Sequence, residues 1–156
     1  MLSLGMGVTA EFEVLTDELR PRLARAFVAA YGPERGQEAL AEALAWAWEN
    51  FGALQEMDNP AGYLYRVGQS RTRPRHSPPP FPAPDAVGVP WVEPDLPDAL
   101  RDLTEHQRVS VVLVHGYGWT RKEVAALLDL APTTVQNHVE RGLTHLRRRL
   151  EAIPDA

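Results

Sequence analysis

The chain has 156 residues, enough for one domain or two small ones, and its 44% apolar content is ordinary for a globular protein. It contains no cysteine, which excludes a disulfide framework and a thiolate metal site and suits a reducing cytoplasm. We find no long apolar run and no basic-then-apolar leader, so we expect neither a membrane span nor a signal peptide. The formal net charge of −5 lowers non-specific affinity for nucleic acid, because that affinity grows with the number of phosphates neutralised.

The N-terminal part of the chain predicts an arm followed by an amphipathic helix. Residues 1–15 show no clear hydrophobic period, so we expect a flexible arm there. From Thr16 onward apolar side chains recur every four residues and predict a helix. Its apolar face is formed by Leu19, Leu23, Phe27 and Tyr31. Pro21 is expected in the early turns, where proline is best tolerated, and Gly32-Pro33 is expected to end the helix.

Two further helices are expected in the first half of the chain. One spans residues 34–51, and we expect its apolar face to include Trp48. Trp46 and Trp48 cannot share a face, because residues two apart on a helix point away from each other. Either one of them is exposed and suits a protein partner, or Trp46 packs under a neighbouring loop. Asn59-Pro60 is typical of a helix start, so a third helix follows it.

Prolines divide the chain into two helical modules. Residues 74–97 hold nine of the 14 prolines, and Pro74 ends the third helix because it cannot donate a backbone hydrogen bond. Such a segment is a stiff, extended linker without a core of its own. We therefore predict an all-α chain with a flexible arm at 1–15, a helical domain at 16–73, a proline-rich linker at 74–94 and a second helical domain at 95–153.

The second module is predicted to end in a helix-turn-helix. The residues TRKE at 120–123 form a capping box, with Trp119 and Val124 placed as a hydrophobic staple around it. Pro132 suits the first position of the next helix. The apolar stripe of that helix is Val135, Val139, Leu143, Leu146 and Leu150. The small Ala125 and the three-residue connection favour a helix-turn-helix over an ordinary helical hairpin.

The other face of this last helix suits contacts with DNA. Thr, Gln, Asn, His and Arg side chains near the start of a recognition helix hydrogen-bond base edges or phosphates in a major groove. Positive charge is concentrated in the same segment: residues 130–150 contain four arginines and Glu140 as the single acid, a net of +3. A local basic footprint is what nucleic-acid binding requires. The alternative is a helical hairpin whose outer face is only solvated.

The pattern resembles a bacterial RNA polymerase sigma factor of the extracytoplasmic-function (ECF) type, in which helical regions 2 and 4 are joined by a linker. The strongest likeness, to region 4, is in LPDALRDLTEHQRVSVVLVHGYGWTRKEVAALLDLAPTTVQNHVERGLTHLRRRL. The segments ALAEALAWAWENF and DNPAGYLYRV are similar to the polymerase-clamp-binding helix and the promoter-melting segment of region 2. The resemblance implies a sigma factor that binds core RNA polymerase and directs promoter-specific, DNA-dependent transcription initiation.

The resemblance also implies roles for individual residues. The upstream promoter element would be met by Arg121, Lys122, Thr133, Thr134, Gln136, Asn137, His138 and Arg141. The melted promoter strand would be met by Asp58, Asn59, Pro60, Tyr63 and Arg66, with Tyr63 as a stacking surface. The polymerase clamp would be met by Glu42, Trp46 and Glu49. Core RNA polymerase and promoter DNA are the implied partners, and an anti-sigma factor is a further one that the family allows.

An enzymatic function is not predicted. The chain has no Gly-rich phosphate loop and no nucleophile elbow, and its histidines are too scattered to form a metal site. We therefore expect no catalytic residue, metal, cofactor or small-molecule substrate.

Two alternatives to the sigma-factor function stay open. One is a stand-alone helix-turn-helix transcriptional regulator, because TVQNHV also resembles the reading helix of response regulators. The other is a degenerate sigma-like adaptor without promoter melting, because Pro74 shortens the third helix, and Asp129 and Ala131 replace the family's usual glycine and capping serine.

Overall fold

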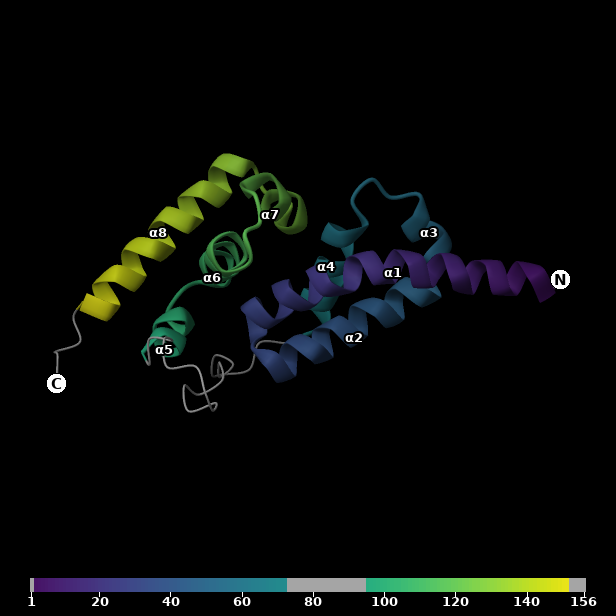
Figure 1. The fold of residues 1–156 in the computed structure, drawn as a ribbon, viewed down its shortest axis with the longest axis horizontal. Coiled ribbons are helices and arrows are strands. Elements are labelled where there is room, and N and C mark those ends of the chain that lie inside the picture. Colours follow the sequence, from purple (N-terminus) through teal and green to yellow (C-terminus); the bar gives the residue numbers. More distant parts are fainter. Residues whose placement is uncertain (1, 73–94, 152–156) are drawn as a thin grey trace.

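The computed structural model describes residues 2–72 and 95–151, and every regular element within these residues is a helix. The order is α1 (Leu2–Tyr31), α2 (Pro33–Glu49), α3 (Phe51–Gln55), α4 (Pro60–Arg71), α5 (Leu96–Arg101), α6 (Glu105–Val111), the π-helical turn η1 (Val112–Gly116), α7 (Arg121–Leu128) and α8 (Pro132–Glu151). The predicted all-α fold with two helical modules is confirmed (Figure 1). The linker predicted at 74–94 and the last two residues of the predicted second domain lie outside the described residues. Among the helices just named, none combines the length and apolar character that crossing a membrane requires.

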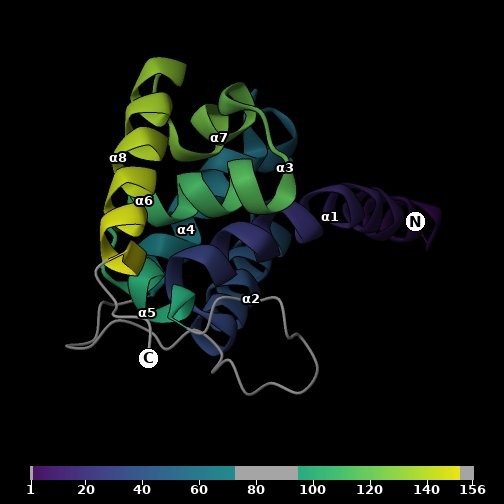
Figure 2. The ribbon, with the colours of Figure 1, turned by 60° about the vertical axis from the view of Figure 1, so that its left-hand side comes forward.

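The first helix is longer than the sequence predicted. α1 is continuous over 30 residues, so the flexible arm predicted for residues 1–15 is wrong from residue 2 onward. Phe12 makes edge-to-face ring contacts with Trp48 and Phe51, at centroid separations of 5.0 and 5.5 Å. These partners are more than thirty residues away in the chain, so no local pattern announces them. In Figures 1 and 2 the N-terminal turns of α1 project beyond the other helices.

Two other details of the first module differ from the prediction. Pro21 lies deep inside α1 and not in its early turns, because the helix begins at Leu2. Trp48 is 53% exposed and does not belong to the buried face of α2. That face consists mainly of small residues (Gly36, Ala39, Leu40, Ala43 and Ala47). A Cβ atom added at Gly36 would lie 2.8 Å from the backbone nitrogen of Val28 in α1. The close approach of the two backbones therefore sets the rotation of α2 and turns Trp48 outward.

The two modules pack against each other. Contacts between them join α1 to α6 and η1, and α4 to α7. A single buried cluster contains Leu23 and Phe27 of α1 together with Val109, Val124 and Val135 of the second module. Figures 1 and 2 show α8 at the edge of the molecule, with α6 and α7 between it and the α1–α4 bundle. Because a core of about 55 residues is marginal by itself, the shared cluster stabilises both modules.

Candidate nucleic-acid interface

Local interactions build the helix-turn-helix of α7 and α8. The Thr120 hydroxyl accepts from the Glu123 backbone N–H, and the Glu123 carboxylate accepts from the Thr120 N–H, both at 3.1 Å. The hydrogen bond from the Thr120 backbone N–H, and after it the Thr120 hydroxyl, lower the pKa of the Glu123 carboxyl. Asp129 ends α7 in the left-handed conformation (φ 57°), and the next residue, Leu130, donates its N–H to the Ala125 carbonyl at 3.0 Å. Aspartate tolerates this conformation better than most residues, so the turn forms without a glycine.

α8 begins at Pro132, as predicted, and presents a polar face to solvent. Its buried residues are Val135, Val139, Gly142 and Leu146. Of the residues predicted to meet the upstream promoter element, the structure exposes Thr133, Gln136, Asn137 and Arg141 and half-buries Thr134 and His138. Arg121 and Lys122 are exposed in the first turn of α7. The structure thus exposes four of the six predicted α8 residues and both predicted α7 residues.

Two members of this set interact with other side chains of the protein. Gln136 Nε2 donates to Glu140 Oε1 at 3.0 Å. The ring of His138 packs edge-on against His106 of α6, with centroids 5.3 Å apart. Burial lowers the pKa of His138, and the nearby His106 and Arg141 lower it further. Its imidazole is therefore neutral at pH 7, with one donor and one acceptor nitrogen.

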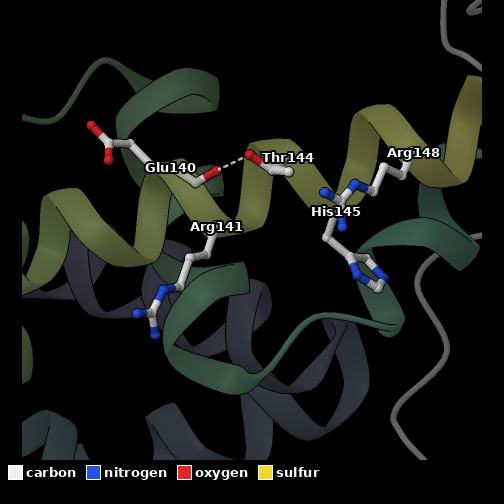
Figure 3. A pocket seen from close by; sticks show the side chains of 5 residues that line it. All are labelled: Glu140, Arg141, Thr144, His145 and Arg148. Atoms are coloured by element: carbon white, nitrogen blue, oxygen red, sulfur yellow. Dashed lines mark hydrogen bonds between the residues drawn. The ribbon is translucent and has the colours of Figure 1, made fainter.

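A surface groove of about 410 Å³ follows the second half of α8. It is lined by Glu140, Arg141, Thr144, His145 and Arg148. In Figure 3 Arg141 and His145 extend to the same side of the helix, whereas the Glu140 carboxylate points away from Arg141. The Thr144 hydroxyl donates to the backbone oxygen of Glu140 at 2.9 Å. His145 and Arg148 were not predicted as site residues, although their spacing of four and seven residues from Arg141 places all three on one face.

Two of the five residues predicted to meet the melted promoter strand, Asn59 and Arg66, contact the helix-turn-helix. Asn59 caps α4 by accepting from the Gly62 N–H at 3.1 Å, and its Nδ2 donates to the Ala126 carbonyl of α7 at 2.6 Å. Arg66 forms an ion pair with Asp129, at 2.8 Å, in the turn between α7 and α8. In this arrangement the first module therefore holds two of its predicted DNA contacts against the second.

The residues predicted to face the polymerase clamp lie beside the predicted strand-contacting set. Glu42, Trp46 and Glu49 share one face of α2 through their spacing of four and seven residues. Trp46 is half-buried and its ring lies against that of Tyr63, with centroids 4.9 Å apart. Glu42 is paired with Arg71 at 3.2 Å. The two remaining predicted residues are Asp58, which is exposed, and Pro60, which begins α4 and is half-buried.

Arg108 joins the two modules and was not predicted. Its guanidinium donates to the carbonyls of Ala29 and Ala30 in the last turn of α1, at 2.9 and 2.6 Å, and to the Leu103 carbonyl at 2.9 Å. Carbonyls at a helix C-terminus lack intrahelical donors and carry partial negative charge, so this cation completes the end of α1. Burial lowers the pKa of Arg108, while the nearby Glu105 acts in the opposite direction. The sequence gives no signal that separates Arg108 from a solvated arginine.

Comparisons with known proteins agree with this architecture. Residues 95–146 match the family described as "Sigma-70, region 4". The solved structure of the sigma factor RpoE in complex with the anti-sigma factor NepR from Bartonella quintana is similar to this chain, with a TM-score of 0.66 and 18% sequence identity. The alignment covers 92% of this chain and 99% of that one. No curated protein matched the sequence.

Proposed function

We propose that this chain is a sigma factor that binds core RNA polymerase in the cytoplasm and directs it to specific promoters. One observation carries the proposal: the polar face of α8 is turned to solvent on a helix-turn-helix that lies within region 4. Asn137 and Arg141, exposed there, have the side chains that read adenine and guanine edges in a major groove. The first module supplies the polymerase contact through Glu42, Trp46 and Glu49. Polymerase, and not this chain, carries out nucleotide transfer.

The two DNA-facing surfaces differ in their availability. The outer face of α8 is open while the modules are packed together, so duplex recognition requires no rearrangement. Asn59 and Arg66, in contrast, bond to Ala126 and Asp129. Contact of α4 with a melted strand therefore requires α4 to part from α7. An anti-sigma factor that holds the modules together would keep the chain inactive, and the complex of the structural neighbour with NepR supports a partner of this class.

The test is reconstitution with core RNA polymerase. We expect the chain to co-purify with the core enzyme and to produce run-off transcripts from promoters of genes that rise on its overexpression. The double variant N137A/R141A is expected to keep polymerase binding and lose promoter choice, because both side chains are exposed and neither supports the fold. Absence of both binding and initiation by the wild-type chain would refute the proposal. A protein that footprints promoter DNA unaided would instead be a stand-alone regulator.

A degenerate sigma-like adaptor is the second candidate, favoured by the bonds that Asn59 and Arg66 make to the helix-turn-helix and by the end of α4 at Arg71. An adaptor only occupies polymerase or an anti-sigma factor. It predicts that N137A/R141A keeps both its partner affinity and its effect in cells. A loss of the cellular effect in this variant, with partner affinity intact, excludes the adaptor.

A further inference from the structure

An exposed apolar patch lies where the first half of α1 meets the end of α2, on the side of the molecule far from α8 (Figures 1 and 2). Trp48 is 53% exposed and Val8 is 45% exposed. The half-buried Phe12 connects them: its ring contacts the Trp48 ring edge-on, with centroids 5.0 Å apart, and it follows Val8 by one helical turn. These side chains begin a continuous surface, which we call the Trp48 patch.

Small side chains continue the Trp48 patch along α2. Ala41 and Ala45 are exposed and precede Trp48 by seven and three residues, which places all three on one face of the helix. Small side chains allow the backbone of a second helix to approach closely. The buried face of α2 uses the same property, because its glycine and alanine residues allow α1 to pack against it. A row of alanines that ends at an indole therefore suits a helix that lies along α2 and covers Trp48.

The charge around the Trp48 patch restricts the class of partner. Residues 7–19 hold four acidic side chains and residues 41–58 hold another four, and neither segment contains a lysine, arginine or histidine. Glu11 and Glu13 flank Phe12 in the sequence, Glu49 follows Trp48, and all three carboxylates are exposed. An acidic rim repels nucleic acid, anionic lipid and a second copy of the same surface. It attracts lysine and arginine side chains of a partner protein.

The Trp48 patch differs from the face of α2 that is proposed to meet polymerase. Residues two apart on a helix point about 160° away from each other, so Trp46 and Trp48 lie on different sides of α2. Trp46 is half-buried against the Tyr63 ring of α4, whereas Trp48 contacts Phe12 of α1. Two different proteins can therefore cover the two sides of α2.

We propose that Val8, Phe12, Ala41, Ala45 and Trp48 form a docking surface for a basic amphipathic helix of a partner protein other than core polymerase. Apolar side chains of that helix, spaced by three and four residues, cover the alanines and the indole. Its lysines or arginines face the surrounding carboxylates. A partner bound here leaves α8 open, because α8 lies at the other end of the molecule (Figure 1). The docking surface goes beyond the proposed function and does not depend on promoter recognition.

The test uses three fluorescent synthetic peptides of about 18 residues, long enough to present several anchors at helical spacing. The first has leucines spaced by three and four residues and lysines elsewhere. The second has glutamate in place of lysine, and the third is a scrambled isomer of the first. Binding to the full-length chain is measured by anisotropy at low and at high salt. We expect the helical leucine–lysine peptide to bind most tightly, and less tightly at high salt because the acidic rim is screened.

Two variants with matched controls locate the bound peptide. Trp48→Gln should weaken binding of the leucine–lysine peptide about 30-fold, as loss of an aromatic anchor does. Its control is Val14→Gln, which also replaces an exposed apolar residue (66% exposed) but on the side of α1 away from Phe12. Ala45→Lys places a cation inside the patch and should weaken binding about tenfold or more. Its control is Ala131→Lys, at an exposed position of the second module. Thermal unfolding followed by circular dichroism verifies that each variant is folded.

Equal peptide affinities of the wild type and W48Q, or tighter binding of the glutamate peptide, would overturn the inference. Loss of core polymerase binding in W48Q would assign the Trp48 patch to polymerase, and a wild-type dimer that W48Q dissociates would assign it to a second copy of the chain. Either result overturns the inference as well. Peptide binding that depends on Trp48, in a chain that does not bind polymerase, would support the docking surface and contradict the proposed function.

Discussion

Replacement of Arg108 by methionine should loosen the two modules from each other. The guanidinium donates two hydrogen bonds to α1, at 2.6 and 2.9 Å to Ala30 and Ala29, and the side chain is 6% exposed. Hydrogen bonds of charged groups contribute about 1.5–3 kcal/mol each, so loss of these two and of the third bond, to the Leu103 carbonyl, gives an upper limit of about 9 kcal/mol. Methionine recovers part of this free energy, because it fills the site without the cost of burying a charged group. That cost is the desolvation that lowers the pKa of Arg108. We expect the free energy of unfolding to fall by about 3 kcal/mol.

Urea unfolding at pH 7, followed by far-ultraviolet circular dichroism, measures this difference. The control is Arg149→Met, which removes an exposed ion pair to Asp102 at 2.9 Å and should cost at most about 1 kcal/mol. Amide hydrogen exchange near Ala30 should accelerate in R108M and not in R149M, because the last turn of α1 loses its capping cation only in the former. If R108M is no less stable than R149M, the role assigned to Arg108 at the module interface is wrong.

Three further predictions concern local packing, titration and capping. Gly142→Ala should destabilise the protein by about 1–3 kcal/mol, because the new Cβ would lie 2.6 Å from Val111 Cγ2. The matched control in thermal unfolding is Gly7→Ala, because a Cβ atom at Gly7 meets nothing within 4 Å. The lowered pKa of His138 means that the unfolded chain binds a proton more readily than the folded one, so the free energy of unfolding should fall as pH drops below about 6.5 toward the folded pKa. His138→Gln should flatten this pH dependence in urea titrations between pH 8 and pH 5. An unchanged pH dependence in the variant would contradict the lowered pKa of His138. Thr120→Ala removes the N-cap of α7 and should cost about 1 kcal/mol in the same urea assay; a stability equal to that of the wild type would show that the capping box does not support the helix.

The packing of the modules connects these residues to function. The observed arrangement uses Asn59 and Arg66 as contacts to α7, and the same side chains are proposed to meet the melted strand. One set of atoms cannot serve both purposes at once. Variants that weaken the interface, R108M among them, are therefore expected to favour the separated state in which α4 is free to meet DNA.

The sequence by itself determined the elements whose causes lie within a few residues. The capping box at Thr120, the proline start at Pro132 and the cap at Asn59 were all predicted, and each depends on hydrogen bonds or backbone restrictions over three or four positions. The polar face of α8 was predicted in the same way, because helical periodicity alone decides which side chains oppose the apolar stripe.

The tertiary structure alone decided how far α1 extends, which face of α2 is buried and that the two modules share a core. The bonds responsible join residues far apart in the chain: 79 positions separate Arg108 from Ala29, and 67 separate Asn59 from Ala126. A side chain's own neighbours in sequence do not encode such partners, because the partner is chosen by how whole helices pack. For the same reason Arg108, an arginine with no distinguishing local pattern, became the cation that joins the modules.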